Sequence, residues 1–149
     1  MDFITKLFDM DLSALVPEMS VFLTGTYILM VAAVLAGPVA LTALGALYLF
    51  RPVPEANFRF GFRTYFGMGS VEAWRFSQRM AGLIFGALGV LLTVIMVIVA
   101  FCFIGKDLLQ IAKTAVICLL WQVGLTLIAR ITISVMAGVY FDKNGNRRK

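Results

Sequence analysis

Three long stretches without charge constrain this chain more than any other feature. Residues 20–50 and 80–105 contain no Asp, Glu, Lys or Arg, and residues 114–141 contain only Arg130. Each stretch is longer than the ~20 apolar residues that cross a bilayer core. Because an unpaired backbone amide in hydrocarbon costs several kcal/mol, each stretch must form a helix that satisfies its own hydrogen bonds. The sequence predicts an all-α integral membrane protein with three transmembrane helices.

The composition excludes a soluble domain. Hydrophobic residues make up 61% of the chain and charged residues 14%, whereas soluble domains have about 45–50% and about 25%. His is absent, and Cys102 and Cys118 lie inside apolar runs, so we expect no metal site. The spans offer no base beside a nucleophile, so we expect neither an enzyme nor a cofactor.

The distribution of Lys and Arg predicts the orientation of the three spans. Nine basic residues lie in the connection 51–79 and the tail 142–149, against three in residues 1–19 and 106–113. The positive-inside bias places the connection and the tail in the cytoplasm and the N-terminus outside. The chain is therefore predicted to be a multi-pass protein of the cytoplasmic (inner) membrane.

The segment 1–19, ahead of the first span, has the pattern of an interfacial helix. Apolar residues recur at helical spacing from Phe3 to Leu15, and the charges lie elsewhere. This pattern is typical of a short amphipathic helix that lies on the outer leaflet. We expect Pro17 to end that helix and turn the chain toward the first span.

The connection 51–79 carries the most distinctive local pattern. Aromatic residues alternate with Arg and Gly as far as Phe66, and Ser70 then offers an N-cap with Glu72 in the first turn of a helix that begins at Val71 and continues into the second span. Basic residues tied to two spans favour anionic lipid headgroups over nucleic acid. The residues of interest in this connection are Asn57, Arg59, Gly61, Arg63, Thr64, Ser70, Glu72, Trp74, Arg75 and Arg79.

These residues resemble the signature of the SdpI family of small bacterial membrane proteins. That signature reads Asn, a short spacer, Gly-aromatic-Arg-Thr, a Ser-Glu-Trp segment and a Gly at the start of the next span. Residues 57–64, 70–74 and Gly82 follow it in this order. The resemblance implies immunity to a secreted peptide toxin. It also implies signalling, because the family's named member captures a cytoplasmic repressor at the membrane when toxin is present.

The spans carry two further patterns. Gly82, Gly86 and Gly89 share one face, where small residues let helices approach closely, either within the chain or in a dimer. On the third span, residues four apart form a polar stripe: Gln122, Thr126, Arg130 and Ser134.

Arg130 is the unusual member of this stripe. An Arg near the centre of a span costs about 2.5–3.5 kcal/mol on insertion scales, and such residues are functional candidates by default. No Asp or Glu lies in any span to pair with it. Three interpretations remain open: snorkelling or contact with carbonyls that Pro38 frees, a site for a toxin carboxylate or anionic substrate, and contact with a second membrane protein.

Three classes of function follow from these patterns. The first is a non-catalytic immunity and signalling protein, in which Arg63 pairs with Glu72 and Trp74 sits in the interfacial aromatic belt. The alternatives are a small oligomeric transporter or channel, and an accessory subunit of a larger membrane complex. The partners implied are membrane lipids, a peptide toxin, and a cytoplasmic repressor or another membrane subunit, with no direct contact to nucleic acid. The sequence leaves monomer and oligomer open.

Overall fold

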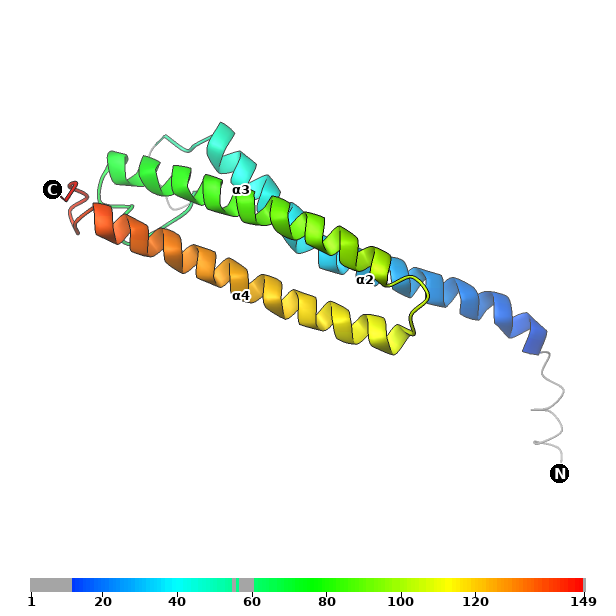
Figure 1. Cartoon of the computed structure of the whole chain (residues 1–149). Helices are drawn as coiled ribbons and strands as arrows, with labels where there is room; N and C mark the ends of the chain where they lie inside the picture. Colours follow the sequence, from blue (N-terminus) through cyan, green and yellow to red (C-terminus); the bar gives the residue numbers. More distant parts are fainter. Residues whose placement is uncertain (1–11, 55, 57–60, 149) are drawn as a thin grey trace, which may run out of the picture.

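The computed structural model describes residues 12–54, 56 and 61–148. The described residues form three α-helices, α2 (Leu12–Phe50), α3 (Val71–Cys102) and α4 (Leu108–Tyr140), which lie side by side as an elongated bundle (Figure 1). Within the described residues there is no strand beyond one isolated antiparallel bridge between Phe141 and Arg147. All three helices are long and apolar enough to cross a membrane. The prediction of three helices long and apolar enough to cross a membrane is thus confirmed.

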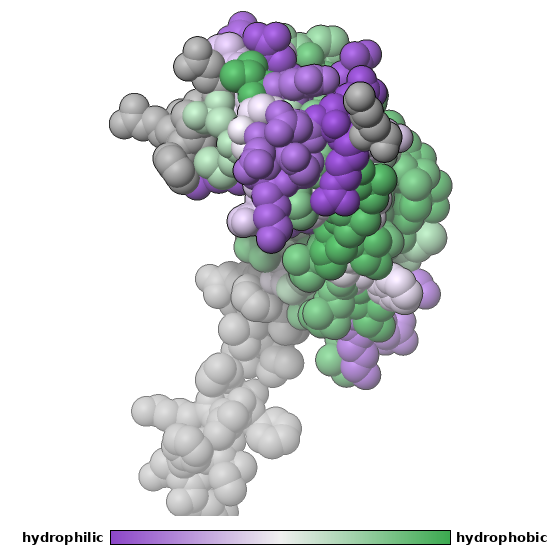
Figure 2. Space-filling model, turned by 90° about the vertical axis from the view of Figure 1, so that its left-hand side faces the viewer, coloured by the Kyte–Doolittle hydropathy of each residue, from purple (hydrophilic) through white to green (hydrophobic). Residues whose placement is uncertain are grey.

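The two ends of the bundle differ. The loop end carries the α2–α3 connection and residues 141–148, and the turn end carries the α3–α4 turn. Beyond the turn end, the first part of α2 continues past its neighbours (Figure 1). Seen from the loop end, hydrophilic residues gather on the face toward the viewer and hydrophobic residues cover the side of the bundle (Figure 2).

The starts and ends of the helices follow local chemistry. The Ser70 side chain accepts a hydrogen bond from the Ala73 amide at 3.1 Å, and Glu72 lies in the first turn, so the predicted N-cap and the helix that continues into the second span are confirmed. At the turn end, Gly105 has a φ of 75°, which a residue with a side chain rarely adopts.

Two prolines lie inside α2. The sequence predicts that the chain turns at Pro17. This prediction is wrong, because α2 begins at Leu12 and continues through Pro17. Pro17 is the sixth residue of α2, so its missing N–H removes one intrahelical hydrogen bond, and the helix continues past it. The remainder of the expected interfacial helix, residues 1–11, lies outside the described residues. Pro38 is fully buried in the middle of the same continuous helix.

The buried core is narrow and divides into two clusters. The cluster near the loop end includes Leu41, Phe85 and Ile133, and the cluster near the turn end is centred on Val34 and Phe103. Large aliphatic side chains point outward along all three helices, as expected where lipid is the solvent. Small residues therefore mediate much of the contact between helices.

Candidate functional site

The helix pair α2–α3 is held together through the glycine face. A Cβ added at Gly89 would lie 2.5 Å from the Thr42 amide nitrogen, and one at Gly82 would lie 3.1 Å from the Leu49 nitrogen. A Cβ at Gly45 would collide with the backbone of Gly86. The structure thus places all three glycines of interest against α2, and the face that a glycine-mediated dimer would use is occupied within the chain.

The α2–α3 connection folds back onto α3 around Trp74. This side chain is fully buried, and its indole Nε1 donates a hydrogen bond to the Val53 carbonyl at 2.9 Å. The prediction that Trp74 lies in an interfacial aromatic belt is therefore wrong. The ring is covered by the connection because Gly61, with a φ of 114°, lets the backbone pass close over it.

Two more side chains of α3 hold the connection in place. The fully buried Gln78 donates from Nε2 to the Phe62 carbonyl at 3.2 Å, while its Oε1 accepts no hydrogen bond from the described residues. On the residue directly before Gln78, the Ser77 hydroxyl lies 3.3 Å from the Thr64 hydroxyl. Thr64 also accepts from the Gly67 amide at 2.9 Å. We call the buried set Phe62, Thr64, Trp74, Ser77 and Gln78 the loop dock.

The loop dock also reaches into the bundle. Phe62 packs edge to face on Phe85 of α3, with ring centroids 5.4 Å apart, and belongs to the core cluster near the loop end. The Phe66 ring lies against Gly138 of α4, where an added Cβ would be 2.8 Å from it. The connection therefore contacts both later helices and closes the loop end of the bundle.

The residues after α4 complete this end. The Ser70 hydroxyl donates to the Gly145 carbonyl at 2.7 Å, so one side chain caps α3 and binds the tail. The tail forms a tight turn in which the Asp142 carboxylate accepts from the backbone amides of Asn144 at 2.9 Å and Asn146 at 2.7 Å. The Asn146 amide, with these other donors and Arg148, lowers the pKa of Asp142 below its ordinary 3.8.

This pKa shift predicts how the tail responds to acid. A lowered pKa means that the turn favours the carboxylate, so its stabilisation is complete above pH 3.8 and is lost as the pH falls through the lowered pKa. We expect the Asn146 amide proton signal to move toward its random-coil position over that acidic range. In Asp142→Asn the signal should not titrate there, and an unchanged titration in this variant would contradict the assignment.

The remaining residues of interest in the connection are arranged differently. Asn57 and Arg59 lie outside the described residues. Arg63, Glu72, Arg75 and Arg79 are exposed, and the pairing of Arg63 with Glu72 stays a prediction. Arg75 and Arg79 line a cleft of about 620 Å³ between the end of α2 and the start of α3.

The family model for the SdpI/YfhL protein family matches residues 55–140, which is more than half of the chain and includes the whole loop dock, α3 and α4. The chain belongs to the SdpI/YfhL family. Comparison with curated proteins finds no match, and comparison with solved structures finds none either. In this SdpI/YfhL member the signature residues Gly61, Thr64, Ser70 and Trp74 serve to dock the connection on α3.

The polar stripe of α4 does not act as one unit. Gln122 forms a hydrogen bond with another helix: its Nε2 donates to the Val34 carbonyl at 2.9 Å. Val34 lies four residues before Pro38, which has no N–H to bond that carbonyl. Thr126 and Ser134 instead donate to carbonyls of their own helix, at 2.8 and 3.0 Å. The carbonyl freed by Pro38 is therefore taken by Gln122 and not by Arg130.

Arg130 lies on the outer side of this SdpI/YfhL bundle. Its side chain is exposed, and it is close enough to Tyr48 of α2 for an electrostatic interaction with that phenol. It sits six residues, or about 9 Å, nearer the loop end than the midpoint of α4. A long side chain at this depth is suited to reach toward the headgroups of the nearer leaflet.

The contact between Gln122 and Val34 can be measured with a double-mutant cycle. We expect Gln122→Leu to lower the free energy of unfolding by about 0.6 kcal/mol, the average for an interhelical hydrogen bond in a membrane, and by no more than about 1.7 kcal/mol. In the Pro38→Ala background the Val34 carbonyl regains a helical donor, so the same change should have less effect. Steric-trap unfolding in bicelles measures both values. Equal effects in the two backgrounds would contradict the proposed role of Pro38.

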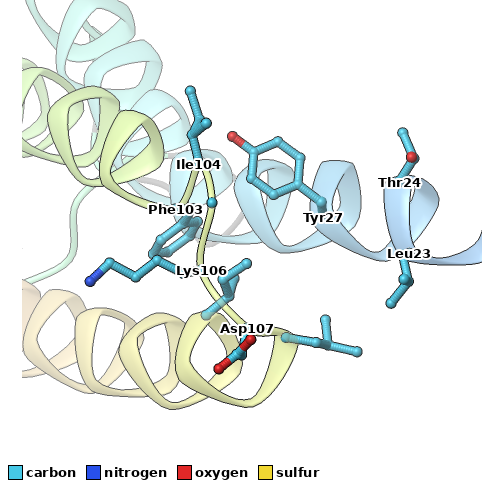
Figure 3. Close-up of a pocket in the computed structure, with 10 residues that line it drawn as sticks. Leu23, Thr24, Tyr27, Phe103, Ile104, Lys106 and Asp107 are labelled. Atoms are coloured by element: carbon cyan, nitrogen blue, oxygen red, sulfur yellow. The ribbon is translucent and has the colours of Figure 1, made fainter. Parts of the chain in front are cut away.

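At the turn end, a cavity of about 680 Å³ lies between α2 and the α3–α4 turn. Figure 3 shows Tyr27 of α2 facing the turn that carries Phe103 and Ile104, with Lys106 and Asp107 beyond. The Tyr27 hydroxyl donates to the Ala100 carbonyl at 3.3 Å, which ties α2 to the end of α3 beside this cavity.

Sequence reasoning missed several residues that build these sites. Ser77 and Gln78 of the loop dock have no signal of their own, because a polar residue beside a span is usually solvated. The tail turn does have a sequence signal, because Asp, Asn and Gly within residues 142–146 are typical turn formers. The pairing of Gln122 with the region before Pro38 was detectable in principle, since each proline in a span leaves a carbonyl to satisfy.

Proposed function

We propose that this protein is a non-catalytic membrane protein that gives immunity to a secreted peptide toxin, relays the presence of that toxin to a cytoplasmic regulator, or does both. Membership of the SdpI/YfhL family supports the proposal. The observation that carries it is that the signature residues form a buried loop dock at one end of the helix pair whose other end borders an open cavity.

The proposed orientation puts that cavity on the outer side of the membrane, where a secreted peptide arrives. The excess of basic residues in the connection and tail supports this orientation. The cavity offers apolar walls from Leu23, Phe103 and Ile111, with Lys106 and Asp107 at the polar side. Apolar walls with a few polar groups suit an amphipathic peptide.

The route from toxin to regulator runs along the contact between α2 and α3. It extends from the Tyr27–Ala100 hydrogen bond near the cavity to the contact between Leu49 and Gly82 near the loop dock. A peptide that displaced α2 at the turn end would move its far end relative to Trp74, because a helix transmits displacement as a rigid element. The loop end would then present its arginines differently to a cytoplasmic partner.

Expression in bacteria that are sensitive to the toxin neutralised by the family's named member tests this function. We expect cells that carry the chain to survive a toxin dose that kills cells with the empty vector. Survival should fall for Tyr27→Ala, which removes the hydroxyl and ring beside the cavity, and persist for Trp121→Ala, an exposed residue away from it. Equal survival with and without the chain would reject immunity to that toxin.

A different observation favours a second function. The side chain of Arg130 is exposed, and the three apolar stretches of the chain contain no Asp or Glu. An acidic residue in a span of another protein would pair with this guanidinium and make the chain an accessory subunit of a larger complex. Purification in mild detergent should then yield a stoichiometric membrane partner that is lost in Arg130→Gln. Retention of the partner by this variant would contradict the pairing.

A further inference from the structure

The cleft beside Arg75 and Arg79 combines an apolar wall with two cations. The wall comes from the last turn of α2 and the extended segment that follows it, and the cations come from the first turns of α3. The apolar lining consists of Tyr48, Leu49, Phe50, Pro52, Val53 and Pro54. The cleft is held open by the loop dock, because the Val53 carbonyl is fixed by the Trp74 indole.

The two guanidinium groups are available to a ligand. Arg75 and Arg79 lie four residues apart on α3, so they share a face and are neighbours on its surface. Both are exposed, and among the residues that the structure describes no acidic side chain lines the cleft. In the part of the chain that the structure describes, neither guanidinium forms an ion pair with a carboxylate. Two adjacent planar guanidinium groups suit the oxygens of a phosphate.

The cleft lies at the boundary between hydrocarbon and headgroups. Arg79 is the last charged residue before the uncharged run that begins at Met80. Beside the cleft, α2 exposes apolar side chains to the lipid, with Phe50 82% exposed and Leu47 47% exposed. A ligand bound to the arginines therefore meets water on one side and acyl chains on the other.

We propose that this cleft binds the headgroup of an anionic phospholipid, with its phosphate between Arg75 and Arg79 and an acyl chain along Leu47 and Phe50. The apolar wall favours a lipid over free phosphate, because a small anion gains nothing from Leu49, Pro52 and Val53. The assignment does not depend on toxin immunity: it holds or fails on lipid binding alone.

Native mass spectrometry of the full-length protein in detergent, titrated with phosphatidylglycerol or phosphatidylcholine, tests the site. We expect phosphatidylglycerol to bind more tightly than phosphatidylcholine. The double variant Arg75→Gln/Arg79→Gln should lose about 10- to 30-fold in phosphatidylglycerol affinity, from about 1 kcal/mol for each arginine near a membrane surface. Arg75→Lys/Arg79→Lys keeps both charges and should stay within a few-fold of the unaltered chain.

The matched control removes two charges at the same end but outside the cleft. Lys143→Gln/Arg147→Gln changes two exposed tail residues and should leave the affinity unchanged. An equal loss in this control would mean general attraction to charge and would overturn the site. Equal affinity for the two lipids, or full retention by the Gln variant of the cleft, would overturn it too. If inorganic phosphate displaced phosphatidylglycerol at equal concentration, the cleft would be a site for a free anion, and the lipid assignment would be overturned.

Discussion

Replacing Trp74 with Ala is expected to release the α2–α3 connection from the bundle. The side chain is fully buried, and its loss leaves both a cavity and the Val53 carbonyl without its donor. Truncation of a buried Trp costs about 3–5 kcal/mol. Because the cavity lies between the connection and α3, we expect most of this loss to appear as easier opening of the connection, by two to three orders of magnitude.

Limited proteolysis with trypsin in detergent measures this opening through the rate of cleavage after Arg63. Trp121→Ala is the matched control, because it removes the same side chain from α4 where the ring is 68% exposed. It should leave the cleavage rate unchanged. Trp74→Phe keeps most of the packing and loses the indole donor, so its rate should rise by about tenfold or less. A Trp74→Ala rate equal to that of Trp121→Ala would contradict the loop dock.

The outline of the fold was predictable from the sequence, because an uncharged run longer than a bilayer core must form a helix to satisfy its backbone hydrogen bonds. The N-cap at Ser70 was equally predictable, because it depends only on residues close to it in the sequence. The place of Trp74 was not: an aromatic residue beside a span has the same sequence signal in an interfacial belt and under a folded connection. Which of the two occurs depends on Gly61 and Gln78, and their proximity to Trp74 exists only in three dimensions.

The polar stripe of α4 shows the same limit. The four-residue spacing predicts that Gln122 and Arg130 lie on a similar side of α4, but it does not predict which of them faces α2. Gln122 is buried against the Val34 carbonyl, whereas Arg130 is exposed. The choice follows from how α4 is rotated about its axis, and small residues such as Ala129 and Ala137, buried on the inner side, fix that rotation by packing.

Replacing Gly89 with Val is expected to separate α2 from α3. The added Cβ would lie 2.5 Å from the Thr42 nitrogen and 2.8 Å from its Cα, and backbone atoms in the middle of a helix have little room to move. Overpacking a tight contact costs about 1–3 kcal/mol, and we expect the upper end of that range here. Gly45→Val, which meets the Gly86 backbone from the other helix, should have a similar effect.

Gly124→Val separates this steric effect from the change in helix propensity. Gly124 is also a mid-helix glycine, but an added Cβ there meets no atom of another described segment within 4 Å. The Gly-to-Val change in propensity is the same at both positions, so the difference in unfolding free energy between Gly89→Val and Gly124→Val reports the collision with α2. Steric-trap unfolding in bicelles measures it. Since α2 also forms one wall of the cleft beside Arg79, Gly89→Val should in addition weaken phosphatidylglycerol binding, whereas Gly124→Val should not. If the two variants unfolded alike, α2 and α3 would not be in contact through their glycines.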